Sequence, residues 1–233
     1  GHRPASPSYA RRARAGMCWS SAAGRTEIVE TRAVLVATPA YVSAELVADL
    51  DATAATALKT IAYAPVAVAN LAYNRAQVAH PLEGFGVLAP SQAQRNFLGI
   101  LWASSLFPSA APKGKVLTIT LMGGALRPEL ALRDEQAIIA SAIADHEALL
   151  GARGTPELAH ATRWERAIPQ YTFDHEQRIA AVEKLERSHP GLYLLGSYRG
   201  GVGVPKCWLN AVATAESAAS YLGQTQVRSE PVL

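Results

Sequence analysis

The sequence contains little of what marks several large classes of protein. It has only two cysteines, Cys18 and Cys207, in 233 residues, so it indicates no disulfide framework and favours a reducing compartment. Its six histidines have no metal-ligand spacing with these cysteines, and no metal site is predicted. The longest apolar stretch, residues 61–73, contains a proline and an asparagine. It falls short of the roughly 20 residues that span a membrane, so it predicts a buried strand.

Acidic residues are absent from the first 26 positions, which carry five arginines. The net charge of the whole chain is only +3, so the remainder is almost neutral and nucleic acid is not an expected partner. Residues 1–26 are therefore predicted to be a basic, disordered arm, with a targeting peptide as the alternative. The hydrophobic content of 49% is sufficient for a buried core.

The remaining chain reads as α/β, then antiparallel β, then α/β. Residues 33–40 predict a strand buried on both faces, and residues 66–122 predict an antiparallel sheet. Asp51 and Asp174 are placed as helix N-caps, the second in a capping box with Gln177. The predicted helices are 40–50, 52–62, 133–150, 175–189 and 205–222, and further strands are predicted at 158–164 and 191–196.

This order of elements indicates one domain inserted into another. The expected outer domain comprises residues 27–62 and 185–223. The expected inserted domain comprises residues 63–184, and a tail follows at 224–233.

A glycine-rich loop, residues 196–207, lies between a predicted strand and the last helix. Unpaired N–H groups and the positive end of the helix dipole make such a loop a place for an anion or a dipole. The dinucleotide pattern G-x-G-x-x-G is not met, because Gly201 and Gly203 are followed by Lys206 at the third position. Two interpretations stay open here: contact with a ligand, and close packing of the helix on the sheet.

Four segments resemble, in chain order, the second half of the FAD-dependent protoporphyrinogen oxidase family within the flavin amine oxidase superfamily. They are AVLVATPAYVSAEL, GFGVLAPSQAQRNFLGILWASSLFPSAAPKGKVLTITLMGG, RWERAIPQY and GLYLLGSYRGGVGVPKC. The resemblance covers about residues 33–222, and LWASSLFP is its most specific part. It implies part of a p-hydroxybenzoate-hydroxylase-like FAD-binding domain with an inserted α+β substrate-binding domain.

The resemblance also implies roles for particular residues. Arg199 could face cofactor phosphates or a substrate propionate, whereas Lys206 and His175 are expected to be surface residues. Pro169 lies in the segment expected near the flavin, and Leu121 stands where many relatives carry an aromatic side chain. The implied cofactor-binding residues are Ala37, Thr38, Pro39, Trp164, Gly201, Val202, Gly203 and Val204, and the implied substrate-pocket residues are Leu88, Leu101 and Leu121.

The implied reaction is oxidation of protoporphyrinogen IX to protoporphyrin IX with FAD and dioxygen, in haem biosynthesis. No side chain is expected to act as a catalytic acid or base, because the flavin carries the redox chemistry. The family's FAD fingerprint lies before the segments matched here, so the chain is expected to be an incomplete copy, inactive alone, whose partner is the missing amino-terminal half.

Two other functions remain open. One is oxidation of coproporphyrinogen or another amine-oxidase-type substrate, and the other is a non-catalytic tetrapyrrole-binding remnant. The resemblance implies a cytoplasmic location, or an organelle in a eukaryote, with peripheral membrane association.

Overall fold

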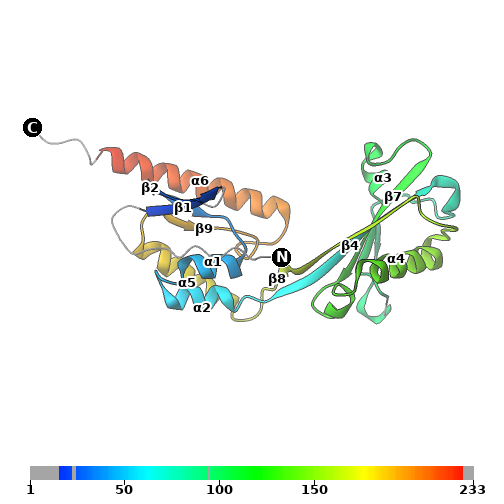
Figure 1. Ribbon diagram of the computed structural model, residues 1–233, viewed down its shortest axis with the longest axis horizontal. Coiled ribbons are helices and arrows are strands. Elements are labelled where there is room, and N and C mark those ends of the chain that lie inside the picture. Colours follow the sequence, from blue (N-terminus) through cyan, green and yellow to red (C-terminus); the bar gives the residue numbers. More distant parts are fainter. Residues whose placement is uncertain (1–15, 23–24, 94, 228–233) are drawn as a thin grey trace, which may run out of the picture. The chain divides into compact units, whose positions relative to one another are not determined.

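The computed structural model describes residues 16–22, 25–93 and 95–227. The chain divides into two compact units, the first formed by residues 1–62 and 169–233 and the second by residues 63–168. Figure 1 shows the ribbon of each unit. The second boundary expected at residue 184 is therefore wrong, because helix α5 (His175–Ser188) packs on α2 and β9 of the first unit.

The first unit is built around two short parallel strands. Strands β3 and β9 pair in parallel, with Leu35 opposite Tyr193. In Figure 1, α6 lies on one side of β9, and α1, α2 and α5 lie on the other. The elements of this unit, besides α5, are β1 (Gly16–Ala22), β2 (Arg25–Thr31), β3 (Val34–Val36), α1 (Ala40–Val47), α2 (Ala52–Lys59), β9 (Leu192–Leu194) and α6 (Val204–Val227).

Of the two N-caps predicted for helices of this unit, the structure confirms the one at α2 and contradicts the one at α5. Asp51 caps α2 as predicted, because its Oδ1 accepts hydrogen bonds from the N–H groups of Thr53 (2.8 Å) and Ala54 (2.9 Å). Asp174 precedes α5 but makes no side-chain cap. Its carboxylate instead lies 3.7 Å from the guanidinium of Arg178, so the predicted capping box is wrong.

The two ends of the chain hold more regular structure than expected. Strands β1 and β2 form an antiparallel hairpin in which Gly16 pairs with Thr31, so the arm predicted to be disordered through residue 26 is wrong from residue 16 on. Pairing with β2 satisfies the backbone groups that a disordered arm would leave to water. Helix α6 continues to Val227, into the predicted tail. Residues 1–15 and 228–233 lie outside the described residues.

The second unit is a sheet of five strands with one long helix. The strand order is β5-β6-β7-β4-β8, and the pairs β5–β6, β6–β7 and β4–β7 are antiparallel as predicted. The elements are β4 (Tyr63–Asn74), β5 (Gly86–Leu88), β6 (Gly99–Leu101), α3 (Ala103–Leu106), β7 (Lys115–Gly123), α4 (Glu135–Leu150) and β8 (Leu158–Pro169).

The two faces of this sheet differ in burial. Along β7, every second residue from Val116 to Met122 is buried, Thr118 and Thr120 included, whereas Leu117, Ile119 and Leu121 are only partly buried. Side chains alternate between the two faces of a strand, so one face belongs to the core and the other stays partly open. The core face also carries Leu71 and Tyr73 of β4, which lie in the same buried cluster as residues of α4.

Helix α4 covers the core face. Asp134 caps its first turn by accepting a hydrogen bond from the N–H of Ala137 at 2.8 Å, and Gly151 ends it with φ +58°. This left-handed conformation is the usual reason for glycine after a helix, and it confirms the predicted stop. The helix buries Ile138, Ala142 and Leu150.

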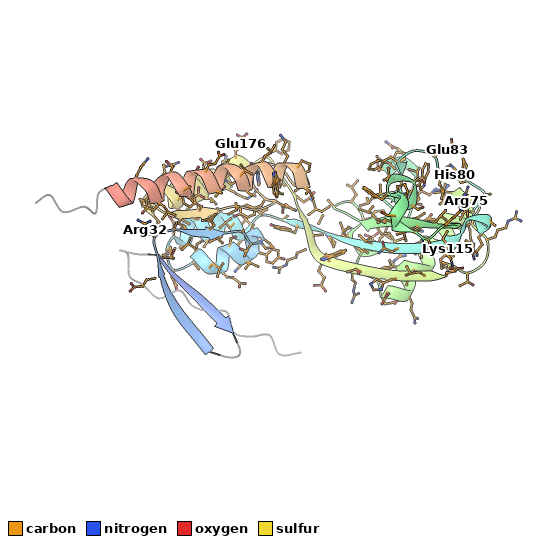
Figure 2. All side chains as sticks on the ribbon, turned by 90° about the horizontal axis from the view of Figure 1, so that it is seen from above. Arg32, Arg75, His80, Glu83, Lys115 and Glu176 are labelled. Carbon is orange, nitrogen blue, oxygen red and sulfur yellow. The ribbon has the colours of Figure 1, made fainter. Side chains whose placement is uncertain are left out.

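The segment LWASSLFP is structural in this unit. Ser104 Oγ accepts a hydrogen bond from the N–H of Leu117 at 3.1 Å, and Ser105 Oγ donates to Leu82 O at 2.6 Å. Trp102 is buried and its ring lies 4.8 Å from that of His80. Each of these contacts anchors α3 to the sheet or to the loop before β5. The guanidinium of Arg75 organises the start of that loop by donating to the carbonyls of Val78 and His80 (Figure 2).

A buried histidine makes the stability of the second unit depend on pH. His146 of α4 is fully buried between Thr118 Oγ1, 2.8 Å from its Nε2, and Ala142 O, 2.6 Å from its Nδ1. Burial lowers its pKa below the ordinary 6.5, against a smaller opposing effect of the bond to Ala142. The neighbouring phenol of Tyr73 has a pKa of about 12, raised by burial, and stays neutral.

The neutral, buried His146 therefore stabilises the second unit fully above pH 6.5, the ordinary pKa that this side chain regains on unfolding. We expect that stabilisation to be lost as the pH falls through the lowered pKa of His146 in the folded protein. The measurement is the urea midpoint for unfolding of the second unit, from pH 8 to pH 5. Unfolding is followed by hydrogen exchange in peptides that cover α4 and β7. His146→Gln removes the titrating group, so its midpoint should fall less over the same range. Parallel curves for the two proteins would contradict the assignment.

Candidate functional site

Parallel pairing of β3 and β9 brings two predicted site segments to the same edge of the first unit. The N–H of Leu195 bonds to Val36 O at 3.0 Å, one residue beyond the paired strands. A side chain at Gly196 would meet Thr38 O at 3.1 Å, so the loops that follow the two strands are in contact there. The carboxyl ends of parallel strands are the usual place for ligands in α/β proteins.

The first of these segments is Ala37–Pro39. Ala37 and Pro39 are exposed and Thr38 is partly buried. Thr38 Oγ1 lies 2.8 Å from Ser43 Oγ, and Pro39 O accepts the N–H groups of Val42 and Ser43 at the start of α1. The segment thus forms a fixed turn into α1 with two exposed residues at its surface.

The second segment is the glycine loop, residues 196–203. Gly196, Gly200 and Gly201 have φ of +158°, +73° and +126°, which other residues adopt at a cost. Gly203 has no such φ, and a side chain there would meet only Pro205 Cδ, at 3.9 Å. Within the described part of the chain, the fold therefore gives no reason for glycine at position 203.

The loop presents backbone donors. Across the described residues, no acceptor pairs with the N–H groups of Val202, Gly203 and Val204. Val204 begins α6, so the positive end of a 24-residue helix adds to these donors. All three residues are exposed, and a missing Cβ at Gly203 leaves room for close approach. These features fit a group that accepts hydrogen bonds from backbone, as a flavin ring does.

The guanidinium of Arg199 is already paired within the first unit. Its Nη1 donates to both carboxylate oxygens of Glu186, at 2.8 and 3.0 Å, and to Leu194 O at 2.9 Å. Its Nη2 lies 3.5 Å from Glu183. The suggestion that Arg199 binds phosphate or propionate is therefore wrong, because α5 supplies its counterions.

His175 is also not a surface residue. It is 8% exposed, and its ring stacks on that of Tyr171 at 4.0 Å with an interplanar angle of 12°. Tyr171 was not singled out by the sequence, yet its hydroxyl contacts the glycine loop at Ser197 and Gly201. Its place two residues after Pro169, in the segment expected near the flavin, was the available signal.

The three predicted pocket leucines lie on one face of the second unit's sheet. Leu88 pairs with Gly99, Gly99 with Leu121, and Leu101 with Ile119. Residues directly opposite each other in antiparallel strands share a face. Leu88 and Leu121 therefore lie in one row across the strands, on either side of Gly99. Leu101, two residues after Gly99 on the same strand, lies in the adjacent row of the same face. Leu88 is 79% exposed, and its side chain reaches over Gly99.

Trp164 and Asn70 lie on the same open face. On β8, Ala161 is buried and Arg163 donates to Arg133 O at 2.9 Å beside the start of α4, so Trp164, one residue on, points away from α4. Its side chain is 48% exposed. Asn70 pairs with Ile119 through the backbone, and among the described residues its side-chain amide has no hydrogen-bond partner. This polar residue in an apolar row was missed by the sequence analysis.

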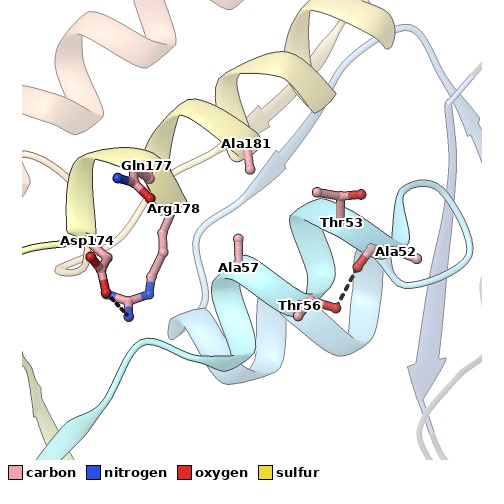
Figure 3. A pocket seen from close by; sticks show the side chains of 8 residues that line it. All are labelled: Ala52, Thr53, Thr56, Ala57, Asp174, Gln177, Arg178 and Ala181. Atoms are coloured by element: carbon pink, nitrogen blue, oxygen red, sulfur yellow. Dashed lines mark hydrogen bonds and ion pairs between the residues drawn. The ribbon is translucent and has the colours of Figure 1, made fainter.

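A separate open groove of about 640 Å³ lies between α2 and α5 (Figure 3). Its one cation, Arg178, is already engaged, because Nε donates to Thr60 Oγ1 at 3.0 Å and Nη1 to Thr172 Oγ1 at 2.7 Å. Ala57 and Ala181 supply small apolar walls. The groove offers no free charged group to a ligand.

Two negative findings bear on the site. In the ranges 16–22, 25–93 and 95–227, no three histidine, cysteine or acidic side chains gather as metal ligands would. None of the helices in those ranges combines the length and the apolarity needed to cross a membrane.

Comparison with known proteins gives consistent neighbours. The family model "Flavin containing amine oxidoreductase" matches residues 12–219. The mitochondrial protoporphyrinogen oxidase of Nicotiana tabacum is 34% identical over 171 residues, covering 72% of this chain and 34% of that protein. Coproporphyrinogen III oxidase of Bacillus subtilis (strain 168) is 28% identical over 208 residues, covering 89% of this chain and 44% of that protein.

Solved structures agree on the fold. A protein from Exiguobacterium sp. 255-15, assigned as a protoporphyrinogen oxidase, superposes with a TM-score of 0.67 at 20% identity, over 88% of this chain and 45% of that one. Cyclohexylamine oxidase from Brevibacterium oxydans IH-35A gives a TM-score of 0.58 at 13% identity, over 86% and 44%. The chain thus spans less than half the length of these relatives.

Proposed function

Because the chain belongs to the flavin-containing amine oxidoreductase family, we propose that it forms part of a flavoenzyme that oxidises porphyrinogens. Protoporphyrinogen IX is the proposed substrate, FAD the cofactor and dioxygen the final oxidant, in haem biosynthesis. The names of the most similar relatives, which include both protoporphyrinogen and coproporphyrinogen oxidases, support a porphyrinogen and keep coproporphyrinogen as the second choice.

The observation that carries this proposal is the glycine loop at the joined ends of β3 and β9. Its N–H groups at Val202, Gly203 and Val204 lack acceptors in the described structure, and Gly203 has open space where a side chain would stand. These groups would hold the flavin ring, and the Ala37–Pro39 turn would lie beside it. FAD bound there would supply the hydride acceptor for oxidation of the macrocycle, with dioxygen as the proposed final oxidant.

The open face of the second unit would bind the macrocycle. Leu88, Leu101 and Leu121 offer apolar contacts in two adjacent rows, and burial of such side chains against an apolar ring favours binding by about 25 cal/mol per Å². The same contacts exclude water. Trp164, which is half exposed, adds an aromatic side chain to this face.

We also propose that residues outside this sequence complete the cofactor site. The chain covers 34% of the Nicotiana tabacum relative. Helix α6 exposes Val204, Trp208, Leu209 and Val212 at helical spacing, with Trp208 71% exposed. An apolar stripe of this kind indicates a face that another segment covers. The 233-residue chain alone is therefore expected neither to retain FAD nor to turn over substrate.

The test uses the full-length product of the gene that encodes these residues, with wild type, Gly203→Val and the matched Gly223→Val compared. Gly223 lies in α6 with open space around it. We expect wild type and Gly223→Val to retain FAD and to produce porphyrin fluorescence from protoporphyrinogen faster than from coproporphyrinogen. Gly203→Val should weaken FAD binding at least about tenfold, because about 1.4 kcal/mol of lost contact has that effect.

Three results would count against the proposal. Stoichiometric FAD on the 233-residue chain would show that no further residues are needed. Full-length protein without flavin would exclude the enzyme, and equal FAD binding by both glycine variants would exclude the loop as the flavin site.

A non-catalytic tetrapyrrole-binding function has one observation in its favour, since the leucine face and Trp164 belong to a single unit. It predicts quenching of tryptophan fluorescence by protoporphyrin in flavin-free protein, and weaker quenching in Trp164→Phe. Quenching together with a flavin-free full-length protein would favour this alternative over the enzyme.

A further inference from the structure

The hydroxyl of Tyr171 bridges two points of the glycine loop. It donates a hydrogen bond to Ser197 O at 2.8 Å and accepts one from the N–H of Gly201 at 2.9 Å. These partners lie four residues apart in the loop, and Tyr171 lies on a different segment, between β8 and α5. A single side chain thus closes the loop immediately before the unpaired N–H groups of residues 202–204.

The ring of Tyr171 packs against the first residue of α5. It stacks on His175, the first residue of that helix, at 4.0 Å and 12°. His175 is buried, and burial lowers its pKa, so a neutral imidazole supports the phenol ring. Fixing the ring leaves the hydroxyl little freedom to leave its two loop partners.

Only a neutral phenol makes both hydrogen bonds, because a phenolate accepts but cannot donate. The pKa of Tyr171 is raised, chiefly by burial and against the effect of the Gly201 N–H. The hydroxyl is therefore protonated throughout the neutral range. A phenylalanine would keep the stacking and lose both bonds.

The bond to Gly201 acts on a residue with unusual backbone geometry. Gly201 has φ +126°. Glycine can adopt this conformation, but it also populates many others, so glycine alone does not fix it. Anchoring the Gly201 nitrogen selects this conformation. The direction of the next N–H groups, at Val202 and Gly203, follows from it.

We propose that Tyr171 is a positioning residue for the flavin: it holds the glycine loop in the conformation that directs the N–H groups of Val202, Gly203 and Val204 at the cofactor. This inference rests on the proposed function, since it takes the loop to be the flavin site. It adds a residue that touches neither cofactor nor substrate and acts through the backbone of the loop.

The test compares wild type, Tyr171→Phe and Tyr193→Phe in the full-length gene product. Tyr193 is the matched control, because its hydroxyl donates to Ser217 O at 3.3 Å in α6, away from the glycine loop. The first measurement is amide hydrogen exchange in flavin-free protein. Tyr171→Phe should speed exchange of the Gly201 N–H, the loop amide that Tyr171 holds, about three- to tenfold, as expected from loss of one hydrogen bond, while peptides of α5 and β9 stay unchanged.

The second measurement is the FAD dissociation constant and the shape of the flavin absorption band, which responds to hydrogen bonds at the ring. Tyr171→Phe should weaken FAD binding about three- to tenfold and shift the band, whereas Tyr193→Phe should do neither. The KM for porphyrinogen should stay at its wild-type value in both variants, because neither residue lies on the leucine face.

Each other outcome has one meaning. If wild type binds FAD and Tyr171→Phe binds it equally well with the same band, the positioning role is wrong and the flavin site stands. If exchange of the Gly201 N–H is unchanged, the loop does not depend on Tyr171 and the inference fails. If wild type binds no flavin, the proposed function fails and the positioning role fails with it. If Tyr171→Phe loses exchange protection throughout the first unit, Tyr171 is needed for the stability of the whole unit and not for the loop alone. That result also overturns the proposal.

Discussion

Replacing Glu186 with alanine is expected to lower the free energy of unfolding of the first unit by about 2 kcal/mol, the size found for hydrogen bonds to charged groups. Glu186 Oε1 accepts the N–H of Leu194 at 2.7 Å, and both of its carboxylate oxygens accept from Arg199. The two side chains are only 17% and 27% exposed. The variant leaves a guanidinium without its main counterion and a strand N–H without an acceptor.

The measurement is urea unfolding of the first unit, followed by hydrogen exchange in peptides of β9 and α5. Glu183→Ala is the control, since Glu183 also faces Arg199 but at 3.5 Å and 46% exposed. An exposed pair contributes about 0–1 kcal/mol, so the control should change little. Equal effects of the two variants would show that burial is not what makes the Glu186 contact strong.

Glu186 also links stability to the proposed cofactor site. It joins α5 to β9 through Leu194 and to the glycine loop through Arg199, whose carbonyl accepts from Asn210 of α6 at 2.7 Å. Loss of this carboxylate should therefore loosen the loop as well as the strand. An arginine in such a loop looks like a ligand-binding group in the sequence, and only the distances show that Arg199 is already paired.

The parts that the sequence predicted well are those decided by neighbours in the chain. The stop at Gly151 and the cap at Asp51 each depend on residues within one helical turn. Local chemistry fixes such features before the chain is folded.

The parts that it missed depend on contacts between distant segments. Tyr171 meets Gly201, 30 residues later, and α5 joins the first unit through packing on α2, which lies before the inserted segment. Asp174 had the spacing of a capping box, but its carboxylate lies beside Arg178 instead. A short polar side chain has several local partners, and the sequence does not rank them.

The second large expected effect concerns the core face of the five-stranded sheet. Leu71→Ala should lower the free energy of unfolding of the second unit by about 3 kcal/mol, within the range of about 2–5 kcal/mol for buried leucines. Leu71 is fully buried in the cluster that β4 forms with α4. The change removes apolar contacts and leaves a cavity that a close-packed interior fills only in part. Urea unfolding, with exchange of α4 peptides as the probe, measures it.

Leu88→Ala is the matched control, because it makes the same chemical change at a side chain that is 79% exposed. It should alter stability by no more than about 0.5 kcal/mol, since little apolar surface leaves the core. If the open face binds the porphyrinogen macrocycle, Leu88→Ala should instead weaken binding by about 1 kcal/mol, or about fivefold, for the contacts it removes. A large stability loss in Leu88→Ala, or unchanged porphyrinogen binding, would contradict the division of the sheet into a core face and a substrate face. That division follows from the alternation of side chains along β4 and β7, where one face meets α4 and the other collects the leucines that the sequence had already set apart.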